Sequence, residues 1–422
     1  MTAARTQGAD GTAQEAASAT RRAPGPAIAW EQARSVARGS AGGPLPVLTC
    51  DLAGALGHAL AEPLTALTDL PPFDTSAMDG WAVAGPGPWQ LRGAAVLAGD
   101  RPEPLDDGSA VPIATGAPLP PGATAVLRRE RGETEDRDGT LYDRTTGPGP
   151  LPPGRDVRPR GQECHSGEPL VPAGVTMTPA MLGLAAAAGY DQVAVHRRPT
   201  VELLLFGDEL LTSGPPRDGL VRDALGPMLP PWLRSCGAQV LGHRMVGDDP
   251  GQVRKALRHS RADVVVTTGS TAGGPVDFLH DALGEAGARL LVDSVAVRPG
   301  HPMLLAQLPP TTDGRSRRLV GLPGNPLAAV AGMVTLAMPL LRRLGGQPDA
   351  EPLRMATAAP LPGHPRDTRL LPVRRTECEV APLPYSGSAM LRGLALADGL
   401  AVVPAGGAVT GAAVEVLGIP GP

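Results

Sequence analysis

The residues best suited to chemistry lie in the segment ADVVVTTGSTAGGPVDFL, residues 262–279. Three consecutive valines, Val264 to Val266, are typical of a buried parallel strand, and a loop of glycine and hydroxyl residues follows them. Glycine permits positive φ and a close backbone approach, so N–H and hydroxyl donors can converge on a phosphate or another oxyanion. The segment predicts an anion site beyond the carboxyl end of a strand, with donors from Gly269, Ser270, Thr271, Gly273 and Gly274.

Three carboxylates are candidates for acid–base or metal chemistry, and each also has a purely structural interpretation. Asp277 follows the donor loop and could hold a hard cation, but it could equally be the N-cap of the next helix. Glu209 could be a solvated turn residue. Asp79 precedes Gly80 in DTSAMDGWAV, where an Asp-Gly turn is the default explanation.

Two more loops are expected at the same edge of the sheet. Gly207-Asp208-Glu209 follows one predicted strand, and the GLPGNP segment, Gly321–Pro326, follows another and opens a helix. Gly324 and Asn325 would present N–H groups and the positive end of the helix dipole there. The G-K-[ST] of a phosphate-binding P-loop and the G-x-G-x-x-G dinucleotide fingerprint are absent, which argues against the common nucleotide-binding loops.

Strand and helix patterns alternate through the middle of the chain. This alternation predicts a doubly wound, three-layer α/β domain. Asp249-Pro250 and Asn325-Pro326 are typical helix starts, as is Thr178-Pro179 further upstream. The predicted segments are 201–206, 228–235, 238–245, 252–259, 263–267, 278–284, 319–322 and 327–343.

The rest of the chain predicts a multidomain α/β protein. Residues 27–61 have helical spacing, short apolar runs between turns indicate an inserted β-rich domain, and the segments 370–374, 390–395 and 400–403 are β-like. The expected divisions are a disordered tail at 1–26, a linking domain at 27–64 and 157–197, the insertion at 65–156, the α/β domain at 198–347 and a C-terminal β domain at 348–422.

Composition narrows the partners and the compartment. A net charge of -4, ten aromatic residues and a single lysine, Lys255, argue against a nucleic-acid-binding protein. Four scattered cysteines without a C-x-x-C pair argue against zinc and favour a reduced, cytoplasmic setting. The longest apolar run, 327–341, is shorter than a membrane-spanning helix needs and contains Pro339, and the first residues lack a signal-peptide core.

Six motifs, taken together and in order, resemble the molybdopterin molybdenumtransferase family, the molybdenum insertases that include the E domain of gephyrin. The first and the last motif are highly specific as a pair, and the match covers nearly everything after residue 27. The motifs are PPFDTSAMDGWAV, IATGAPLPPGATAVLRRE, FGDEL, GSTAGGPVDF, VRPGHP and GLPGNP.

The resemblance implies an elongated four-domain protomer and a homodimer in which the inserted domain of one subunit faces the α/β domain of the other. It implies insertion of molybdate into adenylylated molybdopterin with release of AMP, a late step of molybdenum cofactor biosynthesis. Mg²⁺ would be the metal. A molybdopterin adenylyltransferase and molybdoenzymes are the expected protein partners, with no nucleic acid and no membrane.

By motif position, the resemblance also implies roles for single residues. Asp79, Glu209 and Asp277 correspond to an acidic set that holds magnesium or orients molybdate and water, and Thr115 corresponds to a donor beside them. The positions expected to shape the loop or to bind pterin, phosphate or molybdate are Arg298, Pro323, Gly324, Asn325, Pro326, Arg374 and Ser388.

The chain departs from the family pattern at several positions. Ser294 stands where a lysine is expected, and His301 stands at a basic position of VRPGHP. These losses of positive charge leave a second hypothesis open, a non-catalytic molybdopterin carrier or scaffold. A third is an adenylyltransferase of a related fold, which would not need the inserted β domain. Further departures are Ser270-Thr271-Ala272, Pro275, Asp223-Ala224-Leu225 and Glu163.

Overall fold

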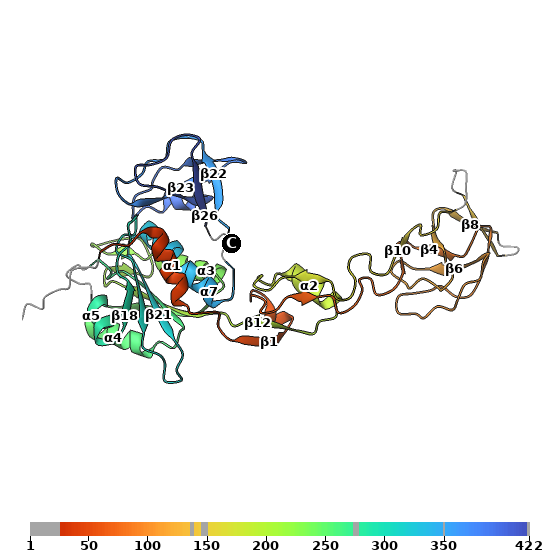
Figure 1. Cartoon of the computed structure of the whole chain (residues 1–422), viewed down its shortest axis with the longest axis horizontal. Helices are drawn as coiled ribbons and strands as arrows, with labels where there is room; N and C mark the ends of the chain where they lie inside the picture. The colour runs from red at the N-terminus through yellow and green to blue at the C-terminus, as the bar shows by residue number, and fades with distance from the viewer. Residues whose placement is uncertain (1–25, 136–138, 145–150, 273–277, 349–350, 420–422) are drawn as a thin grey trace, which may run out of the picture.

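The chain is drawn out along one axis (Figure 1). The computed structural model describes residues 26–135, 139–144, 151–272, 278–348 and 351–419. The α/β domain lies at one end with the C-terminal β domain against it, and the inserted β domain lies at the other end. A narrow linking part connects the two ends. The expected multidomain α/β architecture is thus confirmed.

A six-stranded sheet of order β16-β13-β17-β21-β20-β18 forms the centre of the α/β domain. Four neighbouring strands are parallel, as the alternating pattern predicts: β16 (Gln239–Val246), β13 (Thr200–Phe206), β17 (Val264–Thr268) and β21 (Arg317–Leu322). The sequence analysis missed β20 (Leu304–Leu308), which runs antiparallel beside β21, and β18 (Arg289–Val292) at the edge.

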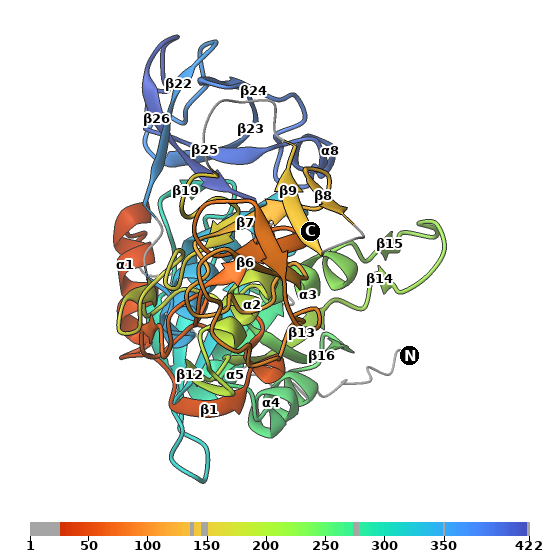
Figure 2. The same ribbon diagram turned by 90° about the vertical axis from the view of Figure 1, so that its right-hand side faces the viewer.

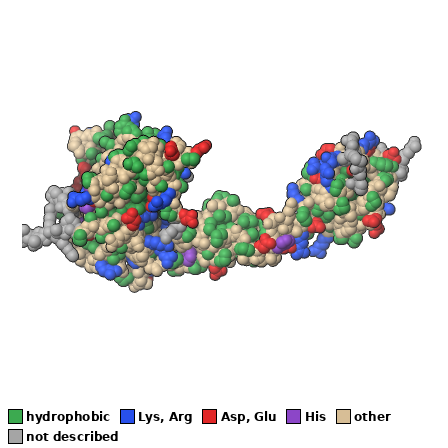
Figure 3. Space-filling view, turned by 45° about the horizontal axis from the view of Figure 1, so that its top comes forward, with side chains coloured by type: hydrophobic (Ala, Val, Ile, Leu, Met, Phe, Trp, Pro, Cys, Tyr) green, Lys and Arg blue, Asp and Glu red, His purple; other side chains and the backbone are tan. Residues whose placement is uncertain are grey.

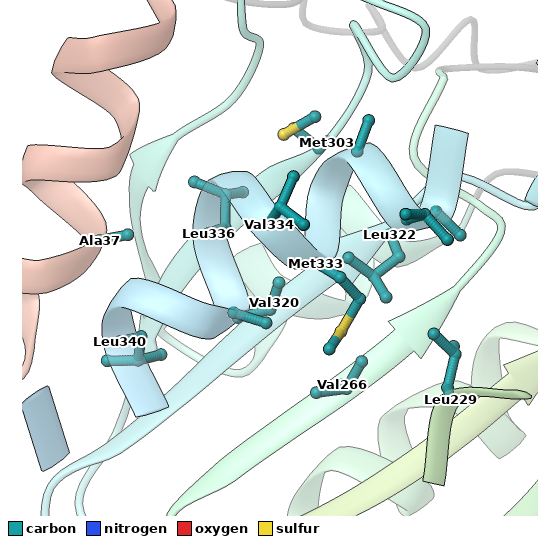
Figure 4. Packing of buried hydrophobic residues seen from close by; sticks show 14 of the residues in the cluster. Ala37, Leu229, Val266, Met303, Val320, Leu322, Met333, Val334, Leu336 and Leu340 are labelled. Atoms are coloured by element: carbon teal, nitrogen blue, oxygen red, sulfur yellow. The ribbon is translucent and has the colours of Figure 1, made fainter. Parts of the chain in front are cut away.

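Helices cover both faces of this sheet because its strands are apolar on both sides. On one face, α3 (Leu225–Ser235) and a long helix pack over Val266, Val320 and Leu322 (Figure 4). The long helix consists of α6 (Pro326–Gly332), a π-helical turn (Met333–Ala337) and α7 (Met338–Leu344). On the other face, α4 (Pro250–His259) and α5 (Leu279–Glu285) pack over Leu204, Val265 and Leu319.

The long helix of residues 326–344 is apolar and long enough to cross a membrane by length and composition alone. Within the protein, however, 78% of its apolar window is buried. Met333 points toward Val266 of the sheet, and Val334 and Leu336, on the other side of the helix, are buried in the same cluster (Figure 4). Its hydrophobicity is therefore explained by its position in the domain core.

The first helix, α1 (Trp30–Ser40), packs on this long helix. Trp30 and Ala33 are buried in the same cluster as Leu340, and the indole Nε1 of Trp30 donates to the hydroxyl of Thr335 at 3.0 Å. Helix α1 thus contributes to the core of the α/β domain, although the chain leaves that domain directly afterwards.

The linking part consists of small antiparallel pairs and one helix. The expected helix over residues 27–61 is wrong beyond residue 40: Pro44 and Pro46 interrupt the pattern, and β1 (Val47–Asp51) pairs with β12 (Gln192–His196). Helix α2 (Pro179–Ala187) begins as expected, since the Thr178 hydroxyl accepts from the Met181 N–H. The other pairs are β2 (Leu64–Thr65) with β11 (Pro169–Val171) and β3 (Thr75–Ser76) with β10 (Val157–Arg158).

Each of the two outer β domains contains one six-stranded sheet. The inserted domain comprises β4 (Gly80–Val83), β5 (Trp89–Leu91), β6 (Ser109–Ile113), β7 (Ala125–Arg128), β8 (Gly132–Glu135) and β9 (Thr140–Asp143). The C-terminal sheet comprises β19 (Val297–Arg298), β22 (Leu353–Thr357), β23 (Thr368–Arg375), β24 (Glu379–Pro382), β25 (Gly399–Val403) and β26 (Ala413–Gly418). Residues 392–395, expected to be β-like, form the short helix α8.

The C-terminal β domain lies directly above the α/β domain in both Figure 1 and Figure 2. Strand β19 explains part of this placement, because it belongs to a segment that continues from β18 of the α/β sheet and pairs with β23 of the C-terminal sheet. The segment between residues 292 and 304 is therefore shared by the two domains, and it contains the VRPGHP motif.

We expect Trp30→Ala to lower the free energy of unfolding of the α/β domain by about 3–5 kcal/mol, because it empties a buried indole site. Trp30→Phe should cost less, about 1–3 kcal/mol, since the ring volume is mostly kept and only the buried Thr335 hydroxyl loses its donor. Denaturant unfolding followed by circular dichroism measures both. An unfolding midpoint for Trp30→Ala equal to that of the unchanged chain would contradict the packing of α1 described above.

Candidate active site at the sheet edge

Three loops begin at the same level of the central sheet. Leu205 of β13 is paired with Thr268 of β17, and Thr268 with Leu322 of β21. Because the strands are parallel, the loops that follow them leave the same edge side by side. The Gly269 N–H donates to the Leu322 carbonyl at 2.9 Å, and a Cβ added to Gly324 would lie 3.7 Å from the Gly269 Cα.

The loop after β17 has an unusual backbone at its start. Gly269 has φ +85° and the next residue, Ser270, has φ +54°, a left-handed conformation that is uncommon for a residue with a side chain. Thr271 is buried, and its methyl group would lie 3.1 Å from a Cβ at Gly321. Close packing therefore fixes the first half of the predicted anion loop. Gly273, Gly274 and Asp277 lie outside the described residues.

Glu209 lies at this edge too. A Cβ built on Gly207, whose φ is +134°, would lie 2.5 Å from a Glu209 carboxylate oxygen, so the carboxylate folds back over the Gly207 backbone. The Glu209 carbonyl accepts from Val221 N–H at 2.9 Å, which ties the loop to a short parallel pair, β14 (Leu210–Leu211) and β15 (Val221–Arg222). Glu209 is an exposed turn residue whose main chain is tied to this short pair.

A second pair of carboxylates lies next to Glu209. The Asp208 N–H donates to the Asp248 carboxylate at 3.3 Å, which joins the loop after β13 to the loop after β16. Asp249, as expected, caps α4 by accepting from the Gln252 N–H at 2.8 Å. Its neighbour Asp248 is therefore left to face the loop of Asp208 and Glu209.

The helix start at Asn325-Pro326 differs from expectation. The side chain of Asn325 makes no capping hydrogen bond. The N–H groups of Leu327 and Ala328 instead donate to the main-chain carbonyl of Ser388, at 2.9 and 3.2 Å. Ser388 belongs to the C-terminal domain, so that domain occupies the first free donors of α6. The cap prediction for Asn325 was wrong because the acceptor comes from a distant part of the chain.

A cleft of about 620 Å³ opens between this helix start and the C-terminal domain. Four residues predicted from the sequence line it: Arg298, Pro323, Asn325 and Ser388. The cleft also contains four polar side chains of which only His301 was singled out beforehand: His301, His364, Arg369 and Ser386. Gly324 and Pro326 flank its lining residues in sequence.

Two arginines in this cleft are held in fixed orientations. Arg298 donates from Nε to the Asp367 carboxylate at 2.8 Å. Arg369 donates to the Pro362 carbonyl and to the Ser386 hydroxyl, each at 3.1 Å. Since a guanidinium stays protonated at physiological pH, the wall of the cleft formed by β19 and β23 presents two permanently charged groups suited to phosphate or molybdate, one of which is paired with Asp367.

Arg374 was expected in the same cleft, but the structure places it elsewhere. It lies on β23, as Arg369 does, and donates to the Leu396 carbonyl at 3.1 Å. Side chains alternate between the two faces of a strand, so residues five positions apart point in opposite directions. Arg369 therefore faces the cleft. Nothing in the sequence distinguishes the two arginines until the pairing of β23 is known.

Asp79 and Thr115 lie on the inserted domain, at the far end of the chain (Figure 1). The Thr115 N–H and hydroxyl both donate to the same Asp79 oxygen, Oδ1, at 2.7 and 2.9 Å. These bonds, the backbone one foremost, hold the pKa of Asp79 below its usual value. Asp79 is thus an ionised, oriented carboxylate, yet within one chain it does not approach Glu209.

The charge distribution matches the modest net charge. In the view of Figure 3, acidic and basic side chains are interspersed at both ends of the molecule. Within the described residues, no group of three or more histidine, cysteine, aspartate or glutamate side chains is close enough to hold a metal ion. A metal at this site would therefore need ligands from outside that set.

Family models match the three main regions of the chain. Residues 28–189 match the MoeA N-terminal region (domains I and II), residues 202–343 match a probable molybdopterin-binding domain, and residues 354–419 match the MoeA C-terminal region (domain IV). Together these regions cover both ends of the molecule and the linking part.

Similar proteins agree with these matches. The chain is 32% identical to molybdopterin molybdenumtransferase 2 of Mycobacterium tuberculosis, over 85% of this chain and 91% of the relative. It is 32% identical to the molybdopterin molybdenumtransferase of Nostoc, over 70% and 69%. A crystal structure of the molybdopterin biosynthesis MoeA protein from Pyrococcus horikoshii superposes with a TM-score of 0.71 at 26% identity, covering 94% and 100% of the chains. The chain therefore belongs to the molybdopterin molybdenumtransferase (MoeA) family.

Proposed function

We propose that this protein is a molybdopterin molybdenumtransferase, which inserts molybdenum from molybdate into adenylylated molybdopterin and releases AMP. The observation that carries the proposal is the cleft lined by Arg298 and Arg369, which are neighbours across β19 and β23, and by Pro323 and Asn325 of the loop after β21. The substrates are a tetrahedral oxyanion and a nucleotide-linked pterin phosphate, and both need fixed donors. The curated relatives carry this activity in their names.

Within the site, we assign separate tasks to the two groups of residues. The loop that begins at Gly269-Ser270-Thr271 supplies backbone and hydroxyl donors to the phosphate groups. The two arginines bind the tetrahedral oxyanion, because charge-assisted hydrogen bonds are about twice as strong as neutral ones. Pro323, Asn325 and Ser388 shape the entrance. Arg298 and Arg369 are register partners on the paired strands β19 and β23, so a single anion can contact both.

Mg²⁺ fits the chemistry of the donor set. The loops after β13 and β16 present Asp208, Glu209 and Asp248, which are hard oxygen donors of the kind that magnesium prefers. We propose that Asp277 and Asp79 complete this acidic set. When bound, the ion would supply charge neutralisation for the phosphate and molybdate oxygens. The residues of this chain orient the substrates and hold water in place.

A second copy of the chain is part of this proposal. Asp79 is an ionised carboxylate oriented by Thr115, and both residues lie at the opposite end of the molecule from Glu209. An antiparallel homodimer would bring the inserted domain of one subunit to the sheet edge of the other, since isologous dimers are the commonest assembly. Each active site would then consist of residues from two chains.

We further propose a cytoplasmic enzyme that receives its substrate from a molybdopterin adenylyltransferase and passes the product to molybdoenzymes. All four cysteines, Cys50, Cys164, Cys236 and Cys378, are free thiols, which is consistent with a reducing compartment. Non-catalytic carriage of molybdopterin is the alternative, and it would leave the acidic set without a function.

The first prediction concerns turnover. Purified protein with adenylylated molybdopterin, magnesium and molybdate should release AMP, and Glu209→Ala or Asp277→Ala should slow that release at least about 100-fold by removing charge that holds the metal. Asp191→Ala, which removes an exposed carboxylate of the linking part, is the matched control and should retain the full rate. Tight pterin binding without AMP release would instead establish the carrier hypothesis.

The second prediction tests whether two chains share a site. Asp79→Ala and Asp277→Ala should each be inactive alone. After unfolding and refolding as an equal mixture, activity should return to about a quarter of the unchanged level, because half of the dimers are mixed and each of those has one intact site. A mixture as inactive as the single variants would show that both carboxylates act within one chain.

The third prediction concerns the charge state of Asp79. Thr115→Val removes the hydroxyl donor but keeps the backbone N–H, so the pKa of Asp79 should rise partway toward its usual value. Carbon NMR of the Asp79 carboxyl group measures this shift without any substrate. Turnover near the acidic end of the activity profile should then fall, because the carboxylate becomes protonated at higher pH than before. An unchanged titration would mean that the hydroxyl contributes nothing to the low pKa.

A further inference from the structure

The cleft contains two histidines whose hydrogen bonds fix their tautomers in opposite ways. The Nδ1 of His301 lies 2.8 Å from the Val295 carbonyl, so Nδ1 carries the proton. The Nδ1 of His364 accepts from the Asp367 N–H at 3.0 Å, so in this ring the proton is on Nε2. The two rings therefore respond differently to a second proton.

These contacts engage the Nδ1 of His364. Its Nδ1 is the nitrogen that would have to gain a proton, and backbone N–H groups of Arg366 and Asp367 already donate to it. The nearby Asp367 carboxylate, 3.3 Å from Nδ1, is engaged by Arg298. A second proton on His364 would break existing hydrogen bonds.

His301 can gain a proton without moving. Its Nε2 lies 3.1 Å from the Ser294 hydroxyl, which donates to the neutral ring. If Nε2 becomes protonated, the ring donates and the hydroxyl rotates to donate to the His301 carbonyl, 3.5 Å away. A hydroxyl can serve either role. Ser294 is buried, so water does not compete strongly for this bond.

The charged groups around the cleft make protonation of His301 dependent on whether an anion is bound. Arg298 and Arg369 oppose a third positive charge when the cleft is empty, and the carboxylate of Asp367 is already paired with Arg298. Asp293, the residue before Ser294, is engaged by His280 Nε2 at 2.6 Å. A dianion bound in the cleft beside the two arginines would reverse this balance and favour a charged His301, which lines the same cleft.

We infer that His301 couples oxyanion binding in the cleft to the uptake of a proton, with Ser294 as the hydroxyl that accommodates both charge states. This inference rests on the proposed function and adds a pH dependence to it. Ser294 and His301 are two of the positions where basic residues were expected, and the structure places them in contact. The pair thus supplies a positive charge only when the anion is present.

The experiment is calorimetric titration of the full-length protein with sodium molybdate, repeated in buffers of different ionisation enthalpy, which gives the number of protons taken up. We expect uptake of up to one proton per molybdate, and an affinity that weakens by at most about tenfold per pH unit between roughly pH 6 and 8.5. Sulfate does not titrate in this range. Its affinity should differ from that of molybdate but should change with pH to the same degree.

Substitutions distinguish proton uptake by His301 from proton uptake by His364. His301→Gln should bind molybdate more weakly and without proton uptake, whereas His364→Gln should retain the uptake. His301→Lys should bind with little dependence on pH, and this variant keeps the test decisive if His301→Gln is poorly folded. Ser294→Ala should reduce the uptake because the protonated ring loses its acceptor.

Uptake that persists in His301→Gln, or that disappears in His364→Gln, would overturn the inference. So would molybdate binding with no proton uptake, or no binding of free molybdate and sulfate at all. AMP release by the unchanged protein is measured separately, and AMP release without molybdate-linked proton uptake would overturn this inference while leaving the proposed function intact.

Discussion

The parallel register of three neighbouring strands is the constraint on which the site depends. Leu205, Thr268 and Leu322 are aligned across β13, β17 and β21, so three loops that are far apart in sequence start side by side. Small residues then let these loops touch: Gly324 approaches Gly269, and Gly321 leaves room for the Thr271 methyl group. A shift of one strand would separate the anion loop from the start of α6 and remove one wall of the cleft.

Docking of the C-terminal domain on the α/β domain forms the other wall of the cleft. The Ser388 carbonyl accepts the N–H groups of Leu327 and Ala328, and β19 pairs with β23. The same pairing sets Arg369 beside Arg298. Helix α6 therefore uses its first donors to hold a domain in place, and the positive charge of the cleft comes mainly from side chains.

The elongated shape separates two carboxylates of the proposed acidic set. Asp79 is oriented by Thr115 at one end, while Glu209 folds over Gly207 at the other. Each carboxylate is prepared by its own domain, which is the arrangement expected if the two carboxylates meet between subunits. The proposed positive charge at His301 controls the site in a different way, because it depends on the bound oxyanion rather than on the second subunit.

The sequence determined most of the α/β elements and their order, because apolar periodicity, glycine loops and Pro-led helix starts are local properties. It predicted the alternating strands and helices of the α/β domain, the caps at Thr178 and Asp249, and the clustering of the loops at Gly207, Gly269 and Gly321. Tertiary structure decided those features that depend on contacts between residues far apart in the sequence. Strand β20 was missed because its antiparallel direction follows from pairing alone, and Asn325 is not a cap because Ser388 takes that place. The face of β23 that meets the cleft, and hence Arg369 rather than Arg374, follows from how the strand pairs and docks, which no local pattern records.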